Sequence, residues 1–264
     1  MSHDNVCYSK KIKIPLHIKC CFMNTHANNP DLKEKFLQLL HSPDEVNIKL
    51  AFEMGKSMPE LDLQQYLNDY LVLWRCFFDK NLRSPVKTRH IAALNQPKLE
   101  VISTRLDYLP AQIKHLQNLQ NLALFANQLN QLPPEIGDLQ NLRDLYIGNN
   151  QVTALPSTII KLQNLKVLSA SLNQFRYLPQ EIFELKKLRT LHLPYNQIES
   201  LPAELGKLEA LQELNLNRNN LTFLPIEIKQ LPALKYLNVA QNPIPQKELN
   251  KISSWLPHCT IHIN

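Results

Sequence analysis

From Leu119 the chain reads LQNLALFANQLNQLPPEIGDLQN, from Leu142 LRDLYIGNNQVTALPSTIIKLQN, and from Leu165 LKVLSASLNQFRYLPQEIFELKK. These stretches share the frame LxxLxLxxNxLxxLPxxIxxLxx, which has a period of 23 residues. A fixed period of this length is typical of solenoids, in which each unit packs mainly against its two neighbours. We therefore expect a repeat fold, and an interaction surface instead of an active site as the functional feature.

The most regular position of the frame is an asparagine. Its carboxamide carries donors and an acceptor, so it can satisfy backbone groups left unpaired at a buried turn. Stacked from one unit to the next, these side chains are expected to form a structural ladder: Asn127, Asn150, Asn173, Asn196, Asn219 and Asn242.

The LxLxxN segment predicts a short strand, because alternation places Leu122 and Leu124 on the inner face and Asn121, Ala123 and Phe125 on the outer one. The Leu-Pro step bends the chain, since proline fixes φ and lacks an N–H. The IxxLxxL spacing that follows predicts a short helical turn with its apolar side inward.

Units begin at residues 96, 119, 142, 165, 188 and 211, and a seventh, from Leu234, departs from the frame after Asn242-Pro243. In the first unit Thr104 takes the asparagine position. Seven parallel strands at a spacing of ~4.8 Å give an arc roughly 30 Å long. We expect the repeats to span residues 96–244.

Segments outside the frame are predicted to cover the ends of the solenoid. Residues 31–95 are expected to form an N-terminal helical cap, with a helix over 31–40, a second opening at Ser42-Pro43-Asp44-Glu45 and a third from about Asp62. The third helix carries a stripe that we expect to be core: Leu63, Tyr66, Leu67, Tyr70, Leu71, Trp74, Phe77 and Phe78. Residues 245–264 are expected to form a C-terminal cap, with a helix over 245–255 and a closing strand over 260–263.

Residues 1–30 form a basic segment with Lys10, Lys11, Lys13 and Lys19. Its alternation of apolar and basic residues fits an edge strand, a membrane-surface segment or a partly ordered tail. The start of the chain has no apolar signal-peptide core, and we expect a cytoplasmic protein with no transmembrane segment. Five cysteines without framework spacing predict free thiols.

Fragments that resemble catalytic or ligand motifs lack the context those motifs need. Gly55-Lys56-Ser57 matches the end of a phosphate-binding loop, but position 50 is leucine where that loop requires glycine. His258, Cys259 and His262 are close in sequence, but on a strand Cys259 faces away from the two histidines. We therefore expect no catalytic residues, no metal and no cofactor.

Outward strand positions, which are free of any core role, are the candidate binding surface. Their aromatic, aliphatic and charged residues have the composition of a protein-binding hot spot. The candidate partner-binding residues are Phe125, Asp144, Tyr146, Leu172, His192, Tyr195, Glu213, Asn215, Arg218 and Tyr236. Because this face carries acids beside its cations and lacks a continuous basic track, no nucleic acid is expected there, although the net charge is +6.

Residues 96 to about 244 resemble the leucine-rich repeat proteins, in the 23-residue LPxxIxxLxxLxxLxLxxNxL form that bacterial and intracellular Ras-group proteins share. The tail NPIPQKELNKISSWLPHCTIHI and the segment SPDEVNIKLAFEMGKS are similar to the ends of such bacterial proteins. The resemblance implies an α/β leucine-rich repeat solenoid, a horseshoe of about seven repeats with parallel strands on the concave face and an N-terminal helical cap. It also implies a protein-interaction scaffold of the kind used in signalling.

Two hypotheses follow. The first is a non-enzymatic module, expected to be a monomer, that binds a protein partner of unknown identity on its concave face. The alternative is a membrane-surface or nucleic-acid adaptor that works through the basic N-terminal segment.

Overall fold

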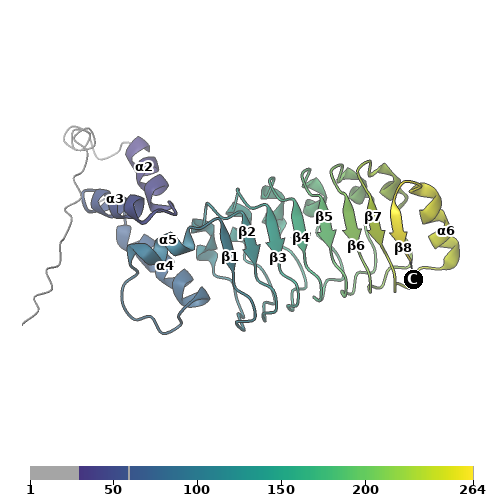
Figure 1. Ribbon diagram of the computed structural model, residues 1–264, viewed down its shortest axis with the longest axis horizontal. Helices are drawn as coiled ribbons and strands as arrows, with labels where there is room; N and C mark the ends of the chain where they lie inside the picture. Colours follow the sequence, from purple (N-terminus) through teal and green to yellow (C-terminus); the bar gives the residue numbers. More distant parts are fainter. Residues whose placement is uncertain (1–29, 59, 264) are drawn as a thin grey trace, which may run out of the picture.

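The computed structural model describes residues 30–58 and 60–263. Within these residues, four α-helices precede a single parallel sheet of eight three-residue strands, arranged in sequence order. Figure 1 shows the helices gathered at one end and the strands side by side along the molecule. The sheet and the helices confirm the predicted α/β repeat solenoid.

The helices are α2 (Pro30–Leu40), α3 (Glu45–Lys56), α4 (Leu63–Phe77), α5 (Thr88–Leu94) and α6 (Gln246–Trp255). The strands are β1 (Lys98–Glu100), β2 (Asn121–Ala123), β3 (Asp144–Tyr146), β4 (Val167–Ser169), β5 (Thr190–His192), β6 (Glu213–Asn215), β7 (Tyr236–Asn238) and β8 (Thr260–His262). Between strands lie 3₁₀ helices: η1 (Ala111–His115), η2 (Pro134–Asp138), η3 (Ser157–Lys161), η4 (Gln180–Glu184), η5 (Ala203–Lys207) and η6 (Ile226–Gln230).

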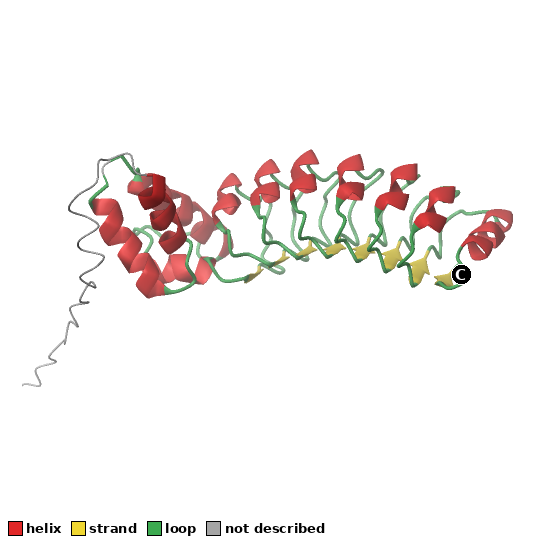
Figure 2. Cartoon of the chain, turned by 90° about the horizontal axis from the view of Figure 1, so that it is seen from above, coloured by secondary structure: helices red, strands yellow, loops and turns green. Residues whose placement is uncertain are grey.

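The register between neighbouring strands is 23 residues from β1 to β7, so equivalent positions of the repeats stand side by side. Strand β8 extends the sheet beyond the repeats and pairs Ile261 with Leu237. Figure 2 shows a gentle arc with the strands along its inner side and the 3₁₀ helices along its outer side. Each outer segment is wider than a strand. Neighbouring repeats are therefore farther apart on the outer side, and the strand layer becomes the concave side of the arc.

The core of the solenoid is built by the apolar positions of the frame. In the third repeat, the buried side chains are Leu142, Leu145, Ile147, Val152, Leu155, Ile159 and Leu162. Each contributes roughly 1.5–3 kcal/mol of burial free energy before the entropy of ordering the chain is subtracted. The same core continues without a break from Phe36 in the cap to Leu256 after α6.

The first helices cover the β1 end of that core. Tyr70 of α4 is fully buried, and its hydroxyl donates to Asn95 Oδ1 at 2.9 Å. Asn95 Nδ2 in turn donates to the Leu40 carbonyl at 2.8 Å. This buried polar chain ties α2, α4 and the residue after α5 together at the start of the repeats.

Three details of the helices differ from the sequence-based expectation. Asp44, not Ser42, caps α3, since its carboxylate accepts from the Val46 N–H at 2.8 Å. Helix α4 ends at Phe77, so Phe78 leaves the core stripe and is 49% exposed. The short helix α5 was not predicted.

Candidate functional site

The inner face of the sheet presents three parallel columns of side chains. The first strand position carries Lys98, Asn121, Asp144, Val167, Thr190, Glu213 and Tyr236. The third carries Glu100, Ala123, Tyr146, Ser169, His192, Asn215 and Asn238. The frame places the next outward column at Ile102, Phe125, Gly148, Ser171, Pro194, Asn217 and Ala240.

The alanines and the glycine in these columns are buried. Ala123 is only 7% exposed and Ala240 only 4%, so neither is the outward surface residue that alternation predicts. Gly148 is also buried. A short side chain on a closely spaced sheet is covered by its larger neighbours, and alternation alone carries no information about their size.

Phe125 lies against Gly148 of the next repeat. A Cβ placed on Gly148 would lie 3.0 Å from Phe125 Cδ2 and 3.1 Å from Phe125 Cε2, which is closer than side chains normally pack. The glycine therefore lets the phenyl ring rest on the backbone of the neighbouring strand, while 42% of Phe125 stays exposed. The ring is thus positioned before any partner arrives.

A second row follows at the end of the strands, in the residue just before each ladder asparagine. All seven residues of this row have φ between 52° and 56°, and none is glycine: Ser103, Ala126, Asn149, Leu172, Tyr195, Arg218 and Gln241. We call this the turn row. The left-handed conformation costs an L-residue other than glycine or asparagine about 1 kcal/mol or more, so the large side chains here are held at a cost in stability.

Leu172, Tyr195 and Arg218 occupy three consecutive rungs of the turn row. Backbone hydrogen bonds join these rungs, from Leu172 N to Pro194 O at 2.9 Å and from Tyr195 N to Asn217 O at 2.9 Å. The Arg218 guanidinium carbon lies 4.7 Å from the centre of the Tyr195 ring, and Arg218 Nε donates to Gln241 Oε1. Leu172 is 45% exposed and Tyr195 43%, so the row presents an aliphatic, an aromatic and a cationic group side by side.

The polar candidates of the inner face are paired along the sheet. Asn121 Nδ2 donates to Asp144 Oδ2 at 3.3 Å, and His192 Nε2 lies 3.3 Å from Glu213 Oε2. Burial, followed by the neighbouring Asp144 carboxylate, raises the pKa of Tyr146. The Tyr146 hydroxyl therefore remains protonated at neutral pH and available as a donor.

Asn215 and Tyr236 complete the predicted set. Asn215 Oδ1 accepts from the Asn217 N–H at 3.1 Å, which holds the backbone after β6. The Tyr236 hydroxyl accepts from Asn238 Nδ2 at 3.3 Å, and its ring lies 5.1 Å from that of His262 in β8. The structure thus places these two residues toward the C-terminal end of the face, and Phe125, Asp144 and Tyr146 toward the other end.

The ladder asparagines lie beneath this surface. Asn173 Oδ1 accepts from the Val152 N–H at 2.9 Å, while Asn173 Nδ2 donates to the Ile147 carbonyl at 2.9 Å. Asn127, Asn150, Asn196, Asn219 and Asn242 repeat this pattern, and Thr104 Oγ1 donates to Asn127 Oδ1 at the first rung. They fix the turn that carries the turn row.

Features expected of an active site are not found in the described residues. Within 30–58 and 60–263, no group of three His, Cys, Asp or Glu side chains is arranged to hold a metal ion. Burial raises the pKa of the Cys76 thiol to about 11 and also raises that of Cys259, so neither is a ready nucleophile. The predicted basic segment, with Cys7, Cys20 and Cys21, lies outside the described residues.

One hollow lies away from the inner face. It has a volume of about 500 Å³ and is lined by Thr153, Ala154, Gln174, Arg176, Tyr177, Leu178, Pro179 and Gln197. These residues follow the turn row in the repeats, so the hollow belongs to the flank of the solenoid.

Among the described residues, no helix is long and apolar enough to cross a membrane.

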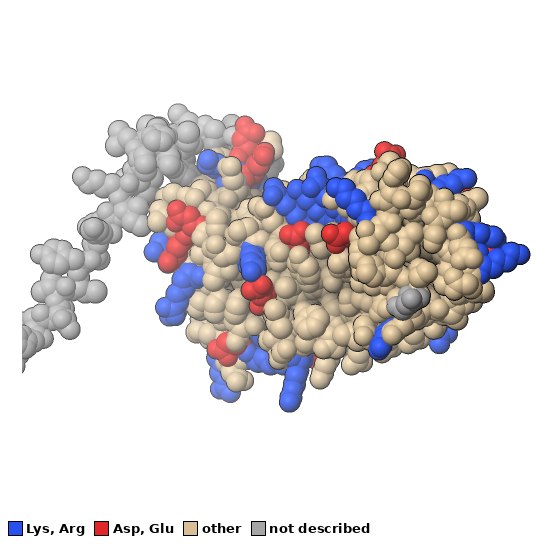
Figure 3. Space-filling model, turned by 45° about the vertical axis from the view of Figure 1, so that its right-hand side comes forward, with Lys and Arg blue, Asp and Glu red and all other residues tan. Residues whose placement is uncertain are grey.

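Sequence reasoning missed one group of surface residues. Arg143, Lys166 and Arg189 directly precede β3, β4 and β5, one position before the columns that we considered. Figure 3 shows Lys and Arg gathered along the upper edge of the molecule, the edge at which the strands of Figure 1 begin. Their spacing of 23 residues was the signal that could have revealed them.

A parallel sheet on the inner side of an arc, with an asparagine ladder at each turn, defines the class of repeat solenoids whose strands line a concave face. Two family models match the chain, a leucine-rich repeat region over residues 50–172 and a leucine rich repeat over 186–244. The chain belongs to the leucine-rich repeat proteins. No curated protein matches it.

Several solved structures are similar to the chain. A leucine-rich repeat protein of Leptospira interrogans is 33% identical with a TM-score of 0.43, over 67% of this chain and 57% of that one. The ectodomain of the Arabidopsis thaliana receptor kinase GASSHO1/SCHENGEN3, in complex with Casparian strip integrity factor 2, is 32% identical with a TM-score of 0.53, over 60% and 20%.

The plant peptide hormone receptor RGFR1, in complex with RGF2, is 27% identical with a TM-score of 0.54, over 64% of this chain and 28% of that one. The chain therefore spans less than two thirds of the length of each of these three proteins.

Proposed function

We propose that this chain is a non-enzymatic binding module that holds a protein partner on its concave face, and that it works as a cytoplasmic monomer. Leucine-rich repeat neighbours whose structures contain a bound peptide or protein factor support a role in protein interaction. The partner-binding surface would comprise Phe125 and the turn row at one side of the face and Tyr146, His192 and Glu213 at its centre.

The observation that carries the proposal is the turn row itself. The backbone at this position favours glycine or asparagine, and Asn149 shows that the repeat accepts asparagine there. Three consecutive repeats nevertheless hold Leu172, Tyr195 and Arg218 in the left-handed region. Strain held at an exposed surface supports a functional role, since these side chains are not needed by the core.

The chemistry of the row suits a protein partner. Exposed leucine and tyrosine lose water-exposed apolar surface on binding, and arginine stacked on tyrosine adds donors for backbone carbonyls or carboxylates. Aromatic residues and arginine are also enriched among residues that dominate protein-binding energy. The Phe125 ring, already seated on Gly148, adds a second apolar contact with little entropy to lose on binding.

The proposal is tested by affinity capture from a lysate of the native source, followed by binding measurements with the purified partner. We expect a Leu172→Asn/Tyr195→Asn variant to bind that partner at least about 100-fold more weakly than the wild type, since hot-spot truncations cost about 2 kcal/mol each. Circular dichroism and thermal melting should show that the variant stays folded.

The matched control changes exposed apolar residues outside the face. Ile160 in η3 and Ile226 in η6 are 38% and 47% exposed, so an Ile160→Asn/Ile226→Asn variant removes comparable surface from the convex side. It should bind as the wild type does. Equal affinity of the turn-row variant and the wild type for the purified partner would show that the concave face is not the binding surface.

A further inference from the structure

Five cations lie at the edge where the central strands begin. Arg143, Lys166 and Arg189 immediately precede β3, β4 and β5, and Lys186 and Lys187 stand in the turn before Arg189. Backbone hydrogen bonds place the three on adjacent rungs, from Lys166 N to Arg143 O at 2.7 Å and from Arg189 N to Lys166 O at 2.8 Å. We call these five residues the basic edge.

None of the five forms an ion pair with any described residue. Lys187 Nζ donates instead to the neutral Asn164 Oδ1 at 2.8 Å, and Lys186 Nζ to the Lys207 carbonyl at 3.2 Å. Arg143, Lys186, Lys187 and Arg189 are exposed, and Lys166 is half-buried. The edge therefore presents positive charge to solvent.

Nearby carboxylates are engaged with other groups. Asp144 accepts from Asn121, Glu213 lies beside His192, and Glu184 pairs with Lys207 at 2.6 Å. Glu209, in the turn before β6, forms no ion pair with the edge. These acids therefore form no ion pair with the basic edge, although Lys186 is near enough to Glu184 to help lower the pKa of that carboxyl.

Nothing in the fold requires these cations. The same position of the frame holds Gln120 before β2 and Gln212 before β6, so a neutral residue is accepted there. Like charges on neighbouring strands repel each other across a rung spacing of ~4.8 Å. Their clustering on three central rungs therefore lowers stability slightly and provides no core contact in exchange.

We propose that the basic edge binds an acidic, carboxylate-rich segment of the protein partner. The inference deepens the proposed function, on which it rests, by giving the partner a chemical character. The edge lies ~20 Å from the turn row, six residues of extended chain away. A partner seated across the concave face would place acidic residues over the basic edge and apolar residues over Leu172 and Tyr195.

An acidic protein segment fits this surface better than a nucleic acid does. Phosphate backbones need a continuous basic track, whereas Gln120 bounds the edge on one side and Gln212 separates it from Lys235 on the other. The adjoining column also carries Asp144 and Glu213, which would repel a phosphate chain lying over the strands. A short run of carboxylates needs only three rungs, and it can end at the edge without extending over that column.

The test uses a fluorescently labelled 12-residue peptide of alternating Glu and Ser, and the full chain. In anisotropy titrations at low salt, we expect an Arg143→Gln/Lys166→Gln/Arg189→Gln variant to bind the peptide about 10-fold more weakly than the wild type, because three charge contacts of modest strength are lost. Raising the salt should weaken the wild type more than the variant.

A control variant removes the same charge elsewhere. Lys33 in α2, Lys229 in η6 and Lys247 in α6 are exposed and form no ion pair with any described residue, so their replacement by glutamine changes the net charge equally. This control should keep wild-type affinity for the peptide. An equal loss in both variants would show that net charge, and not the basic edge, determines binding, and would overturn the proposal.

Two further measurements separate the possible outcomes. The Leu172→Asn/Tyr195→Asn variant should keep its affinity for the acidic peptide, so a failure of the proposed function at the turn row is distinguishable from a failure at the basic edge. A single-stranded oligonucleotide or anionic phosphatidylserine vesicles that bind through the edge while the peptide does not would also overturn the proposal.

Discussion

A single asparagine in each repeat satisfies backbone groups of two rungs. For Asn173, the carboxamide oxygen accepts from Val152 N, and the nitrogen donates to the carbonyls of Ile147, Ala170 and Ser171. The side chain is only 7% exposed, so water cannot replace these partners. Loss of a ladder asparagine would therefore leave buried backbone N–H and carbonyl groups without hydrogen-bond partners.

We predict that Asn173→Ala lowers the free energy of unfolding by about 3 kcal/mol, because at least one buried N–H and one buried carbonyl lose their partners. Urea denaturation followed by circular dichroism measures the change. The adjacent Gln174 is exposed, so Gln174→Ala is the control and should change the stability by less than about 0.5 kcal/mol. Similar losses in the two variants would show that the ladder bonds contribute little.

The strain of the turn row can be measured at Leu172. Both alanine and asparagine remove the leucine side chain. Alanine keeps the strain of the backbone, whereas asparagine adopts φ near 55° more readily. We predict that Leu172→Asn is more stable than Leu172→Ala by about 1 kcal/mol. Equal stability of the two variants, measured by urea denaturation, would mean that the backbone at this position carries no significant strain.

The 23-residue period was enough to predict the positions of residues on the face, and it could not predict their environments. Leu122, Leu145 and Leu168 fall where alternation places them, because every unit shares one register. The repeat pattern does not predict which neighbour covers Ala123, and it does not predict that Phe125 rests on Gly148. Those outcomes depend on side-chain sizes in adjacent repeats, where the sequence is variable.

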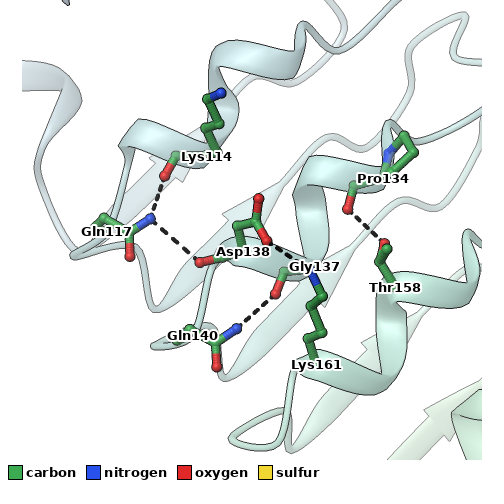
Figure 4. A network of polar contacts seen from close by, with 8 residues as sticks. All are labelled: Lys114, Gln117, Pro134, Gly137, Asp138, Gln140, Thr158 and Lys161. Atoms are coloured by element: carbon green, nitrogen blue, oxygen red, sulfur yellow. Dashed lines mark hydrogen bonds and ion pairs between the residues drawn. The ribbon is translucent and has the colours of Figure 1, made fainter.

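At the scale of elements, two neighbouring 3₁₀ helices of the outer layer, η2 and η3, approach each other closely at a glycine. Figure 4 shows Gly137 of η2 beside Thr158 of η3, whose hydroxyl donates to the Pro134 carbonyl at 2.6 Å. A Cβ on Gly137 would lie 2.3 Å from the Thr158 carbonyl oxygen. Since that atom belongs to the backbone, the two 3₁₀ helices would have to separate to admit a side chain.

Gly137→Ala is therefore predicted to lower the free energy of unfolding by about 2 kcal/mol, as expected for overpacking. Ser157→Ala, at an exposed position of η3, is the control and should be nearly neutral. The two variants are compared by thermal melting under the same conditions. An unchanged melting temperature for Gly137→Ala would show that η2 and η3 can separate at little cost.

Helices of the cap were less predictable than the repeats. Helix α4 has a clear apolar stripe over four turns, and its position followed from that spacing. Helix α5 contains only seven residues, TRHIAAL, which is too short to show a helical period. Asp44 caps α3 instead of Ser42 because both residue types, which stand on either side of Pro43, can cap a helix, and local sequence does not decide between them.

At the scale of the whole molecule, the contact between cap and solenoid contains a buried histidine pair. His41, just after α2, lies with its ring centre 6.4 Å from that of His115 at the end of η1. His115 Nε2 is 3.0 Å from Asp69 Oδ2 of α4. A hollow of about 310 Å³ adjoins the pair, with Leu37, His41, Tyr66, Lys114, His115, Gln117 and Asp138 in its lining.

This arrangement resists protonation. Burial first, and then the neighbouring His115, lowers the pKa of His41 from 6.5 to about 4, and the buried His41 Nε2 has no hydrogen-bond partner among the described residues. Burial also lowers the pKa of His115, although Asp69 opposes the shift. Lys114, which lines the same hollow, further disfavours a positive charge there, whereas Asp138 favours it.

The sign of the pH dependence follows from these shifts. Between pH 6.5 and about 4 the unfolded chain binds a proton at His41 that the folded chain does not, so stability falls as the pH is lowered through this window. Above pH 6.5 both states are neutral and the contribution is complete. Lowering the pH from 7.5 to 5 is therefore predicted to cost about 2 kcal/mol at this site.

We predict that His41→Leu removes most of this dependence, because leucine suits the apolar side of the hollow and does not titrate. Thermal melting at pH 7.5 and pH 5 gives the comparison, and amide hydrogen exchange shows whether α2 opens first. The exposed His258 provides the control, since His258→Gln should keep the wild-type pH dependence. If His41→Leu lost as much stability on acidification as the wild type does, the cap would be held independently of the charge on His41, and other titrating groups would account for the loss.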